Sequence, residues 1–477
     1  MTAATSKPDV SPLVRAVGRQ GTDIIDEALL GRVRLCIIGS DHDPADRRFA
    51  PIFPEDKGAQ ARADFDRAVV EAMRDGLTLR TRRGAVIEFR GAPPRYQKPL
   101  DFDPGFSSNS LSLMDLAGIA HAHKVYHRLV PASREPSLLR AMAGSGLTQH
   151  FVGEYVYQSV DGSSRIPLGL IYQYAEGDGL DVPLRASLHS LWEALVAGMP
   201  VDLAVSSAVN GLEHPLTRAG RFLLDFHKEL DARIGVDALF PFEAFTAATG
   251  ERIGEVAAMI KADGLRPAAA GESVVDALWA EWSLAATVPR ADWRTGASHG
   301  DLHLSHFLRA EQSRGVWRMR LIDLSTPPLE VDGVGVIAQS PWQDVVALLR
   351  GLDCFASDEL AHRVGLDLCV PKAEVGEAAY LRAAGLQPYA PGWTADRLAH
   401  LEHLRRAAAA WQGRISGFLV RGYAPLAGGA LHPAWRMLRL HRLLHELAYA
   451  YENGRPYFAA INLRHALEGA TGAGRST

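Results

Sequence analysis

The chain has 477 residues, of which 47% are hydrophobic and 22% charged, with a formal net charge of -4. This length predicts two or three domains, and the absence of a basic excess argues against nucleic-acid binding. Three cysteines at distant positions argue against a disulfide framework, and the polar residues 1–12 and the lack of a membrane-length apolar run predict a cytoplasmic protein without membrane attachment.

The first 95 residues predict a small mixed module. The apolar run Leu35–Ile38 and the segment Ala85–Phe89 are typical of strands, and Asp64–Met73 has a helical pattern. Pro93-Pro94 and the turn residues 101–104 then interrupt the pattern. We therefore assign residues 1–95 to an N-terminal cap module.

Residues 96–178 read as successive strands and predict a five-stranded sheet. Lys124 lies inside an apolar strand, where an ammonium is costly unless it is used, so it is the natural phosphate contact. The alternative is an edge-strand lysine that reaches solvent. Glu135, which begins the next helix, is the first candidate for its partner, although it could simply compensate the helix dipole. The predicted strands are Ser110–Leu113, Gly118–Tyr126, Val152–Tyr157 and Leu168–Tyr174.

Residues 179–477 are mainly helical, because apolar positions recur at a spacing of three and four through Leu188–Leu195, Phe222–Leu230 and Val275–Leu284. The segment 267–271 is the most linker-like interior stretch. The pattern as a whole predicts an α+β protein with a sheet lobe at 96–178 and a helical lobe at 179–477.

Inside the helical part, two aspartates flank a predicted β-hairpin. His-Gly-Asp at residues 299–301 precedes an apolar run that starts at Phe307, and Trp317, Met319 and Leu321 alternate with arginines after a turn. Asp301 on the entering loop and Asp323 at the end of the second strand then emerge at the same edge. Phosphoryl transfer needs one aspartate for the acceptor hydroxyl and another for the metal. The alternative is that both only cap turns.

Taken in order, these and other motifs resemble the maltokinase family, a branch of the aminoglycoside phosphotransferase-like kinases. The resemblance covers residues 105–467. It implies a bilobal protein-kinase-like fold, ATP and Mg²⁺ as cofactors, and phosphoryl transfer to a sugar hydroxyl. It also implies a polar loop over the phosphates with Ser108, Asn109 and Ser110, next to the phosphate lysine Lys124. The matching stretches are 107–112, 124–129, 299–304, 340–350, 446–449 and 455–456.

Two positions depart from the family pattern. His306 stands where kinases of this fold carry Asn or Gln on the second metal, and imidazole is a poor ligand for Mg²⁺. Ser325 replaces the glutamate of the family's Asp-Phe-Glu pattern. A one-metal or Mn²⁺-tolerant enzyme and a degraded kinase are both compatible with these changes. The structural alternative is that His306 turns into the hairpin and bonds the backbone.

We therefore expect an ATP-dependent kinase with Asp301 as the base and Asp323 as the principal metal ligand, with His306 beside it. Maltose is the acceptor that the resemblance suggests, and glucosamine or an aminoglycoside is the alternative. A different class, a pseudokinase that binds nucleotide without turnover, remains open. Protein partners cannot be read from the sequence.

Overall fold

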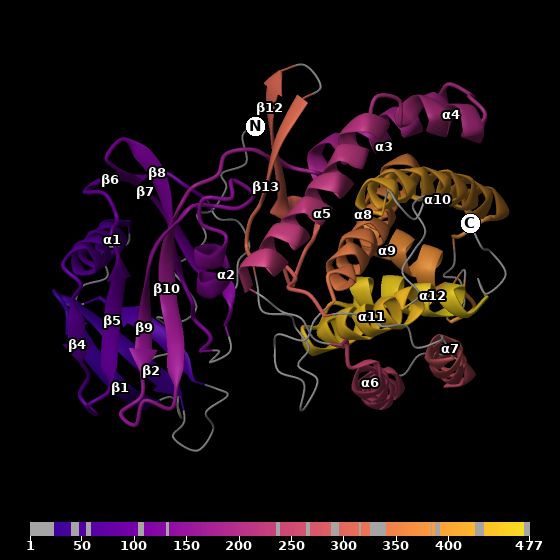
Figure 1. Ribbon diagram of the computed structural model, residues 1–477. Coiled ribbons are helices and arrows are strands. Elements are labelled where there is room, and N and C mark those ends of the chain that lie inside the picture. The colour runs from indigo at the N-terminus through magenta and orange to yellow at the C-terminus, as the bar shows by residue number, and fades with distance from the viewer. Residues whose placement is uncertain are drawn as a thin grey trace. The chain divides into compact units, whose positions relative to one another are not determined.

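The chain forms two compact units, Met1–Ala175 and Glu176–Thr477. The first is rich in strands and the second is mainly helical in the computed structural model (Figure 1), so the predicted order of a sheet part and a helical part is confirmed. The structure describes residues 23–39, 47–53, 59–103, 109–129, 133–234, 239–263, 268–287, 295–313, 316–324, 340–382, 384–386, 392–424 and 434–471.

The first unit contains an antiparallel sheet of seven strands, in the order β4-β5-β9-β10-β8-β7-β6. The predicted count of five was therefore too low. The four strands given by residue range correspond to β7, β8, β9 and β10, and β4, β5 and β6 also join the sheet. The boundary near residue 95 does not separate compact units, since strands from both sides of it share this sheet. The strands are β4 (Thr78–Arg80), β5 (Val86–Gly91), β6 (Tyr96–Leu100), β7 (Ser110–Leu116), β8 (Ile119–Val125), β9 (Phe151–Gln158) and β10 (Arg165–Gln173).

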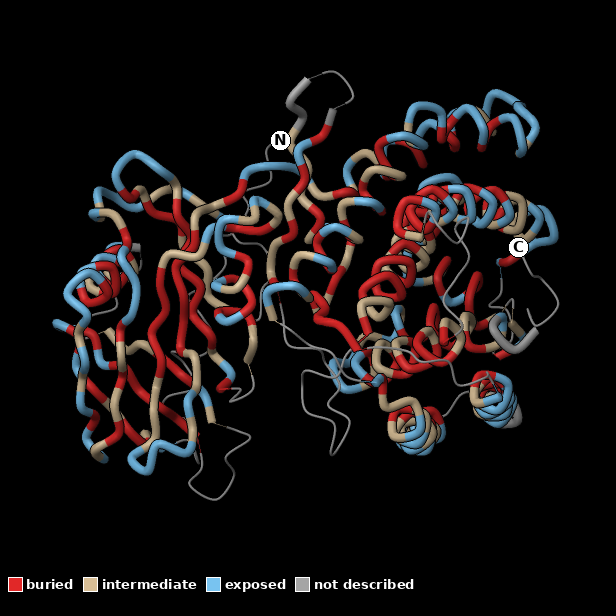
Figure 2. The backbone as a smooth tube through the Cα atoms, viewed as in Figure 1, coloured by how far each residue is buried: buried red, intermediate tan, exposed pale blue. Residues whose placement is uncertain are grey.

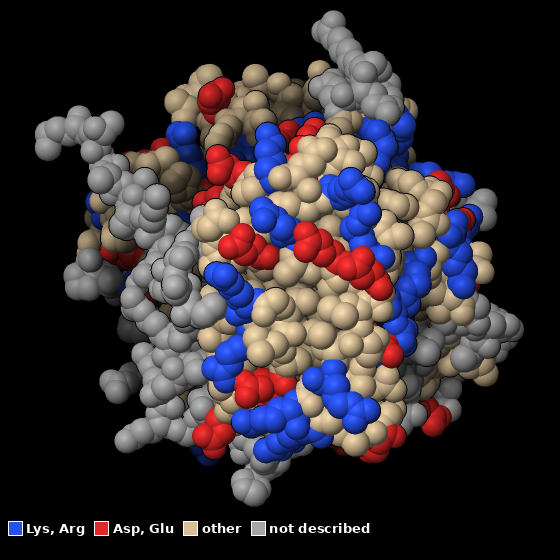
Figure 3. Space-filling view, turned by 90° about the vertical axis from the view of Figure 1, so that its left-hand side faces the viewer, with Lys and Arg blue, Asp and Glu red and all other residues tan. Residues whose placement is uncertain are grey.

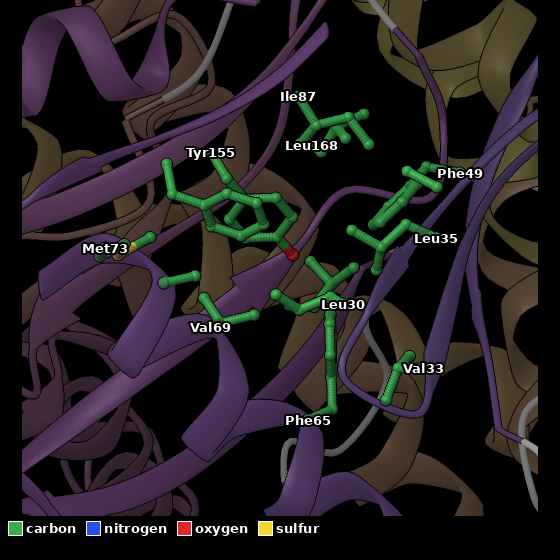
Figure 4. Close-up of a cluster of buried hydrophobic side chains, with 14 of the residues drawn as sticks. Leu30, Val33, Leu35, Phe49, Phe65, Val69, Met73, Ile87, Tyr155 and Leu168 are labelled. Atoms are coloured by element: carbon green, nitrogen blue, oxygen red, sulfur yellow. The ribbon is translucent and has the colours of Figure 1, made fainter. Parts of the chain in front are cut away.

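A second, three-stranded sheet shares the core of the first. It contains β1 (Asp23–Leu30), β2 (Val33–Gly39) and β3 (Arg48–Ile52). Its apolar side chains join those of the larger sheet and of α1 (Ala59–Arg74) in one buried cluster (Figure 4). Burying this apolar surface in common is favourable, which explains why the predicted cap does not form a core of its own.

A buried hydrogen-bond cluster fixes α1 to the larger sheet. Asp66 of α1 lies 2.7 Å from His123 Nδ1 and accepts from Ser112 Oγ at 3.0 Å, and His123 Nε2 lies 3.2 Å from the Tyr155 hydroxyl. Successive side chains of a strand face opposite sides of the sheet. Since His123 faces α1, the next residue, Lys124, faces the other side of β8.

The second unit consists mainly of helices, and the three predicted helical segments lie within α3, α5 and α7, which confirms them. The linker predicted at 267–271 is wrong for its described part, because residues 268–271 begin α7. Buried residues concentrate on α8 and on the facing sides of α10 and α11 (Figure 2). The helices are α3 (Asp181–Val196), α4 (Val201–Ala208), α5 (Glu213–Ile234), α6 (Phe242–Asp263), α7 (Ala268–Ala286), α8 (Trp342–Leu368), α9 (Lys372–Gly376), a π-helix (Glu377–Arg382), α10 (Ala395–Tyr423), α11 (Trp435–Glu452) and α12 (Pro456–Thr471).

The predicted hairpin is confirmed. β12 (Phe307–Ser313) and β13 (Val316–Leu321) pair antiparallel with Phe307 opposite Leu321, and the two-residue strand β11 (Asp178–Gly179) pairs with β12. This register places the chain segments before Phe307 and after Leu321 at the same end of the hairpin.

The charges on the surface and the character of the helices can be described in turn. On the face drawn in Figure 3, Lys and Arg side chains are interspersed with Asp and Glu. Among the described residues, every helix is too short or too polar to cross a bilayer.

Two glycines let α5 and α10 cross in backbone contact. A Cβ added at Gly220 would collide with the Leu419 carbonyl oxygen, and one added at Gly422 would collide with that of Thr217. The close approach brings the Tyr423 hydroxyl of α10 to 3.0 Å from Nδ1 of His227 on α5. The crossing therefore positions a histidine that becomes important below.

This crossing gives the first prediction. Gly422→Ala should lower the free energy of unfolding by about 1–3 kcal/mol, the usual cost of overpacking. Gly417→Ala in the same helix, where a Cβ meets no atom within 4 Å, should instead raise it by about 0.5–1 kcal/mol through helix propensity. Urea denaturation measures both, and equal effects of the two substitutions would contradict the close crossing.

Candidate active site

A buried carboxylate holds the loop that carries Asp301. Asp344, in the first turn of α8, accepts hydrogen bonds from the backbone amides of His299 at 2.5 Å and Gly300 at 3.0 Å. Gly300 has a φ of 98°, a conformation that a residue with a Cβ rarely adopts. His299 donates from Nε2 to the carbonyl of Ile322 at 2.8 Å. The loop is thus fixed both to α8 and to the chain after β13.

Asp344 stays ionised although it is buried. Burial alone would raise the pKa of Asp344, but the hydrogen bond and charge of His227 and the contacts of His299 outweigh it and hold the pKa below its usual value. His227 Nε2 lies 2.8 Å from the carboxylate. The sequence analysis quoted this segment without giving Asp344 a role, and the signal was a carboxylate directly before the apolar run 345–349. Nothing in the sequence singled out His227.

Asp301 itself pairs with an arginine that the sequence analysis missed. Arg442 of α11 donates from Nη2 to Asp301 Oδ1 at 3.2 Å, and the aspartate side chain is 45% exposed. Burial favours the protonated acid, but the charges of Arg442, His303 and His306 prevail and lower the pKa of Asp301. Asp301 is therefore an ionised acceptor at neutral pH, and it can orient a hydroxyl and take its proton.

The Asp301 pair continues into a chain of alternating charges. Arg442 donates to Glu446 at 2.9 Å, and the same carboxylate accepts from Arg350 of α8 at 2.8 Å. Arg350 is buried, so removal of Glu446 would take away one of the two carboxylates, with Asp353, that compensate a buried guanidinium. No local pattern could reveal these pairs, because Arg442 lies 141 positions after Asp301.

The structure brings Asp301, His306 and Asp323 together at the mouth of the hairpin. His306 Nδ1 lies 3.0 Å from the Asp301 carbonyl oxygen, and Nε2 lies 3.3 Å from Asp323 Oδ2. Asp323 has a φ of 59°, a left-handed conformation that is uncommon outside glycine and is often found at functional sites. His306 therefore makes the backbone hydrogen bond of the structural alternative and also faces the second carboxylate.

This geometry can be compared with the arrangement of ligands that a divalent cation requires. Because Nδ1 donates to a carbonyl, the neutral His306 ring has its lone pair on Nε2, facing a carboxylate oxygen. Two acceptors this close repel each other unless they share a proton or a cation, and neighbouring ligands of an octahedral ion stand on the order of 3 Å apart. The described residues contain no group of three His, Cys, Asp or Glu side chains placed to hold a metal. The pair fits an ion that takes its other ligands from phosphate oxygens and water.

In the first unit, Lys124 and Glu135 form a buried ion pair. Lys124 Nζ lies 2.8 and 3.0 Å from the two carboxylate oxygens of Glu135, the first residue of α2 (Glu135–Ala141), and the Tyr126 hydroxyl donates to the same carboxylate at 2.6 Å. The edge-strand alternative for Lys124 is wrong, since β8 lies between β10 and β7.

The residues of the predicted phosphate loop are only partly described. Ser108 lies outside the described residues, as does Ser325. Asn109 immediately precedes β7, and Ser110 is the first residue of that strand, opposite Val125. The Ser110 hydroxyl lies 2.6 Å from His127 Nε2.

Comparisons with known proteins identify a similar fold but no family. No protein-family model matches the sequence, and no curated protein matches it. A glucosamine kinase in complex with glucosamine, ADP and inorganic phosphate has a TM-score of 0.50 and 18% identity, over 96% of this chain and 98% of that chain. This likeness shows the fold, and the predicted kinase-like fold is confirmed.

Two further solved structures are more distant. A glucosamine kinase in another crystal form has a TM-score of 0.48 and 17% identity, over 93% of this chain and 90% of that one. A thermostable mutant of an aminoglycoside phosphotransferase with ADP and hygromycin B has a TM-score of 0.36 and 12% identity, over 80% and 96% of the two chains.

Several histidines around Asp301 are held neutral. Burial and the nearby His306 lower the pKa of His303 to about 4, and burial and Arg442 lower that of His445 to about 4. His441, whose ring centre lies 4.3 Å from that of Phe245, has a pKa lowered to about 3 by burial and by His445. His441 therefore packs in the core.

These shifts predict the pH dependence of stability. Below the ordinary histidine pKa of about 6.5 the unfolded chain binds protons that the folded chain does not, so the free energy of unfolding falls with pH. The fall should continue to a pH of about 4 for His303 and His445 and about 3 for His441. In urea titrations, His441→Phe should make the slope shallower by up to about 1.4 kcal/mol per pH unit. An unchanged slope would contradict a neutral, buried His441.

Proposed function

We propose that the protein is an ATP-dependent kinase that transfers the γ-phosphoryl group to a hydroxyl of a sugar. The observation that carries the proposal is the pair of aspartates at one end of a hairpin, with the Asp301 loop fixed by the buried Asp344. The acceptor oxygen attacks the γ-phosphorus, its proton passes to Asp301, and the bond to the ADP oxygen breaks. The kinase-like fold supports this assignment.

The remaining residues act on the nucleotide in this proposal. The Lys124 ammonium, held by Glu135 and Tyr126, contacts phosphate oxygens and offsets their charge. Asp323 and His306 hold Mg²⁺ or Mn²⁺, which neutralises charge on the transferred group when it is bound. The polar loop with Ser108, Asn109 and Ser110 stays a prediction from the family resemblance.

The acceptor is proposed as an aminosugar or a maltose-like sugar. The glucosamine kinase that shares the fold supports an aminosugar, and the motif resemblance supports maltose. Turnover of ATP with glucosamine, maltose, glucose and hygromycin B, each with Mg²⁺ and with Mn²⁺, tests the proposal. Turnover that depends on one acceptor supports a kinase, and nucleotide binding without turnover on the whole panel would favour the pseudokinase.

Asp301→Asn should lower turnover by about two to four orders of magnitude, because the proton acceptor is lost, while nucleotide affinity stays nearly unchanged. Asp225→Asn is a matched control. Asp225 also pairs with an arginine at 3.2 Å and is 49% exposed, so its loss tests the effect of removing such a pair elsewhere. Steady-state rates and nucleotide titrations measure both variants. Near wild-type turnover in Asp301→Asn would remove Asp301 from the mechanism.

Lys124→Met should lower turnover by about two to three orders of magnitude, the scale for one lost electrostatic contact. It should also lower the free energy of unfolding by about 3–5 kcal/mol, because the buried Glu135 carboxylate loses its counter-charge. The double variant Lys124→Met with Glu135→Gln should recover most of the stability and none of the activity. Recovery of both in the double variant would make the pair purely structural.

His306→Gln should shift the metal preference from Mn²⁺ toward Mg²⁺, because an amide oxygen suits the harder ion better than imidazole does. His400→Gln is the control, since His400 Nε2 also faces a carboxylate, that of Asp367, at 3.0 Å. The ratio of initial rates with the two ions is the measurement. An identical ratio in wild type and His306→Gln would assign His306 to the hairpin alone.

A further inference from the structure

The second unit contains a cavity of about 750 Å³ bounded by α8, α10, α11, α12 and the π-helix. This volume is within the usual range of small-molecule sites, roughly 300–1,000 Å³. Its lining includes Tyr380 and Trp435 as well as charged side chains, and it does not include Asp301, His306 or Asp323. The cavity is therefore distinct from the candidate active site.

The charges that line the cavity are unbalanced toward positive. Arg405, Arg421, Arg439 and Arg464 face the carboxylates of Asp353 and Glu468. Glu468 pairs with Arg464 at 2.7 Å and with Arg405 at 3.4 Å, and Asp353 pairs with Arg350 at 3.3 Å. Arg421 pairs with Glu213 at 2.8 Å.

Arg439 differs from the other three arginines that line the cavity. Within the part of the chain that the structure describes, no hydrogen bond or ion pair reaches its guanidinium. Burial and the neighbouring Arg350 lower the pKa of Arg439 more than the carboxylates of Asp353, Glu281 and Glu468 raise it, so these carboxylates offset its charge only in part. A phosphate or carboxylate group would supply the missing counter-charge and match the planar guanidinium with two hydrogen bonds.

The wall formed by α10 includes a run of small residues, Ala408, Ala409, Gly413, Ser416 and Gly417. A Cβ at Gly413 or Gly417 would meet no atom within 4 Å, in contrast to Gly422, where the backbone of α5 leaves no room. A glycine inside a helix costs about 0.5–1 kcal/mol relative to alanine. No packing contact requires Gly413 and Gly417, and their effect is to keep the cavity open.

A continuous set of polar contacts links the cavity to Asp301. Asp353 and His465 both line the cavity and contact Arg350, at 3.3 and 2.8 Å. Arg350 then contacts Glu446 at 2.8 Å, Glu446 contacts Arg442 at 2.9 Å, and Arg442 contacts Asp301 at 3.2 Å. Arg350 therefore contacts both the lining of the cavity and the chain of charges that ends at Asp301.

We propose that this cavity is a second binding site, for a small organic anion that carries a phosphate or carboxylate group. When an anion occupies the cavity, the contacts of Arg350, Glu446 and Arg442 change, and with them the contact between Arg442 and Asp301. The binding site stands independently of the proposed kinase function, and an effect on turnover rests on that function.

Calorimetric titration of the full chain with 3-phosphoglycerate, citrate and inorganic phosphate tests the site. At least one organic probe should bind wild type, and 3-phosphoglycerate and citrate distinguish a phosphate from a carboxylate ligand. Arg439→Gln, which removes the charge, and Gly417→Leu, which fills the cavity, should each weaken binding about tenfold or more. Arg414→Gln, on the exposed side of α10, should bind as wild type does. Thermal melts check that each variant is folded.

The site is overturned if no organic probe binds at about 10 mM, a concentration that still detects millimolar affinity, or if all variants bind equally. If inorganic phosphate binds and neither organic probe does, the proposal of an organic ligand is wrong. Coupling is read by amide hydrogen exchange of residues 299–303, which needs no turnover. The bound probe should change this exchange in wild type and not in Gly417→Leu.

Turnover gives the second readout of coupling. The probe should change kcat/KM of wild type about threefold or more, the lower range of allosteric coupling, and leave Gly417→Leu, with its wild-type basal rate, unaffected. Unchanged exchange and turnover in the presence of bound probe would overturn the coupling. If the wild-type protein phosphorylates no acceptor, the proposed function is wrong. The titrations and the exchange experiment still test whether the cavity binds an anion and whether binding affects residues 299–303.

Discussion

The hydrogen bonds from the His299 and Gly300 amides to Asp344 are the interaction on which the active-site geometry depends. An ionised carboxylate inside a core costs several kcal/mol unless donors surround it. Here two backbone amides and the imidazole of His227 provide them. The loop cannot leave α8 without exposing this buried charge to an apolar environment, so the position of Asp301 is fixed by the stability of the fold.

The same requirement extends into the packing of the helices. His227 can reach Asp344 because it lies on α5, and Tyr423 of α10 holds the other nitrogen of its ring. That contact exists because Gly220 and Gly422 allow the two helices to touch along their backbones. The contact between α5 and α10 therefore determines the orientation of His227, which binds the carboxylate that holds the Asp301 loop.

Charge pairs hold proposed functional residues within each of the two units. Lys124 and Glu135 are buried together in the first unit, and Asp301 and Arg442 begin a chain of alternating charges in the second. In the second unit, the charge of Arg442 helps to lower the pKa of Asp301 against the effect of burial. Arg439 stands out against this background, because it is a buried cation that no hydrogen bond or ion pair reaches among the described residues.

The sequence by itself determined the features that rest on neighbouring residues. Alternation at Trp317, Met319 and Leu321 specified the hairpin, and its register placed Asp301 and Asp323 at one end, because a period of two allows one register with the apolar face buried. Only the tertiary structure decided that β4, β5 and β6 extend the sheet, that Asp344 holds the loop, and that Arg442 pairs with Asp301. These contacts join residues far apart in the chain, and the burial that makes them necessary is a property of the whole core, which no local pattern contains.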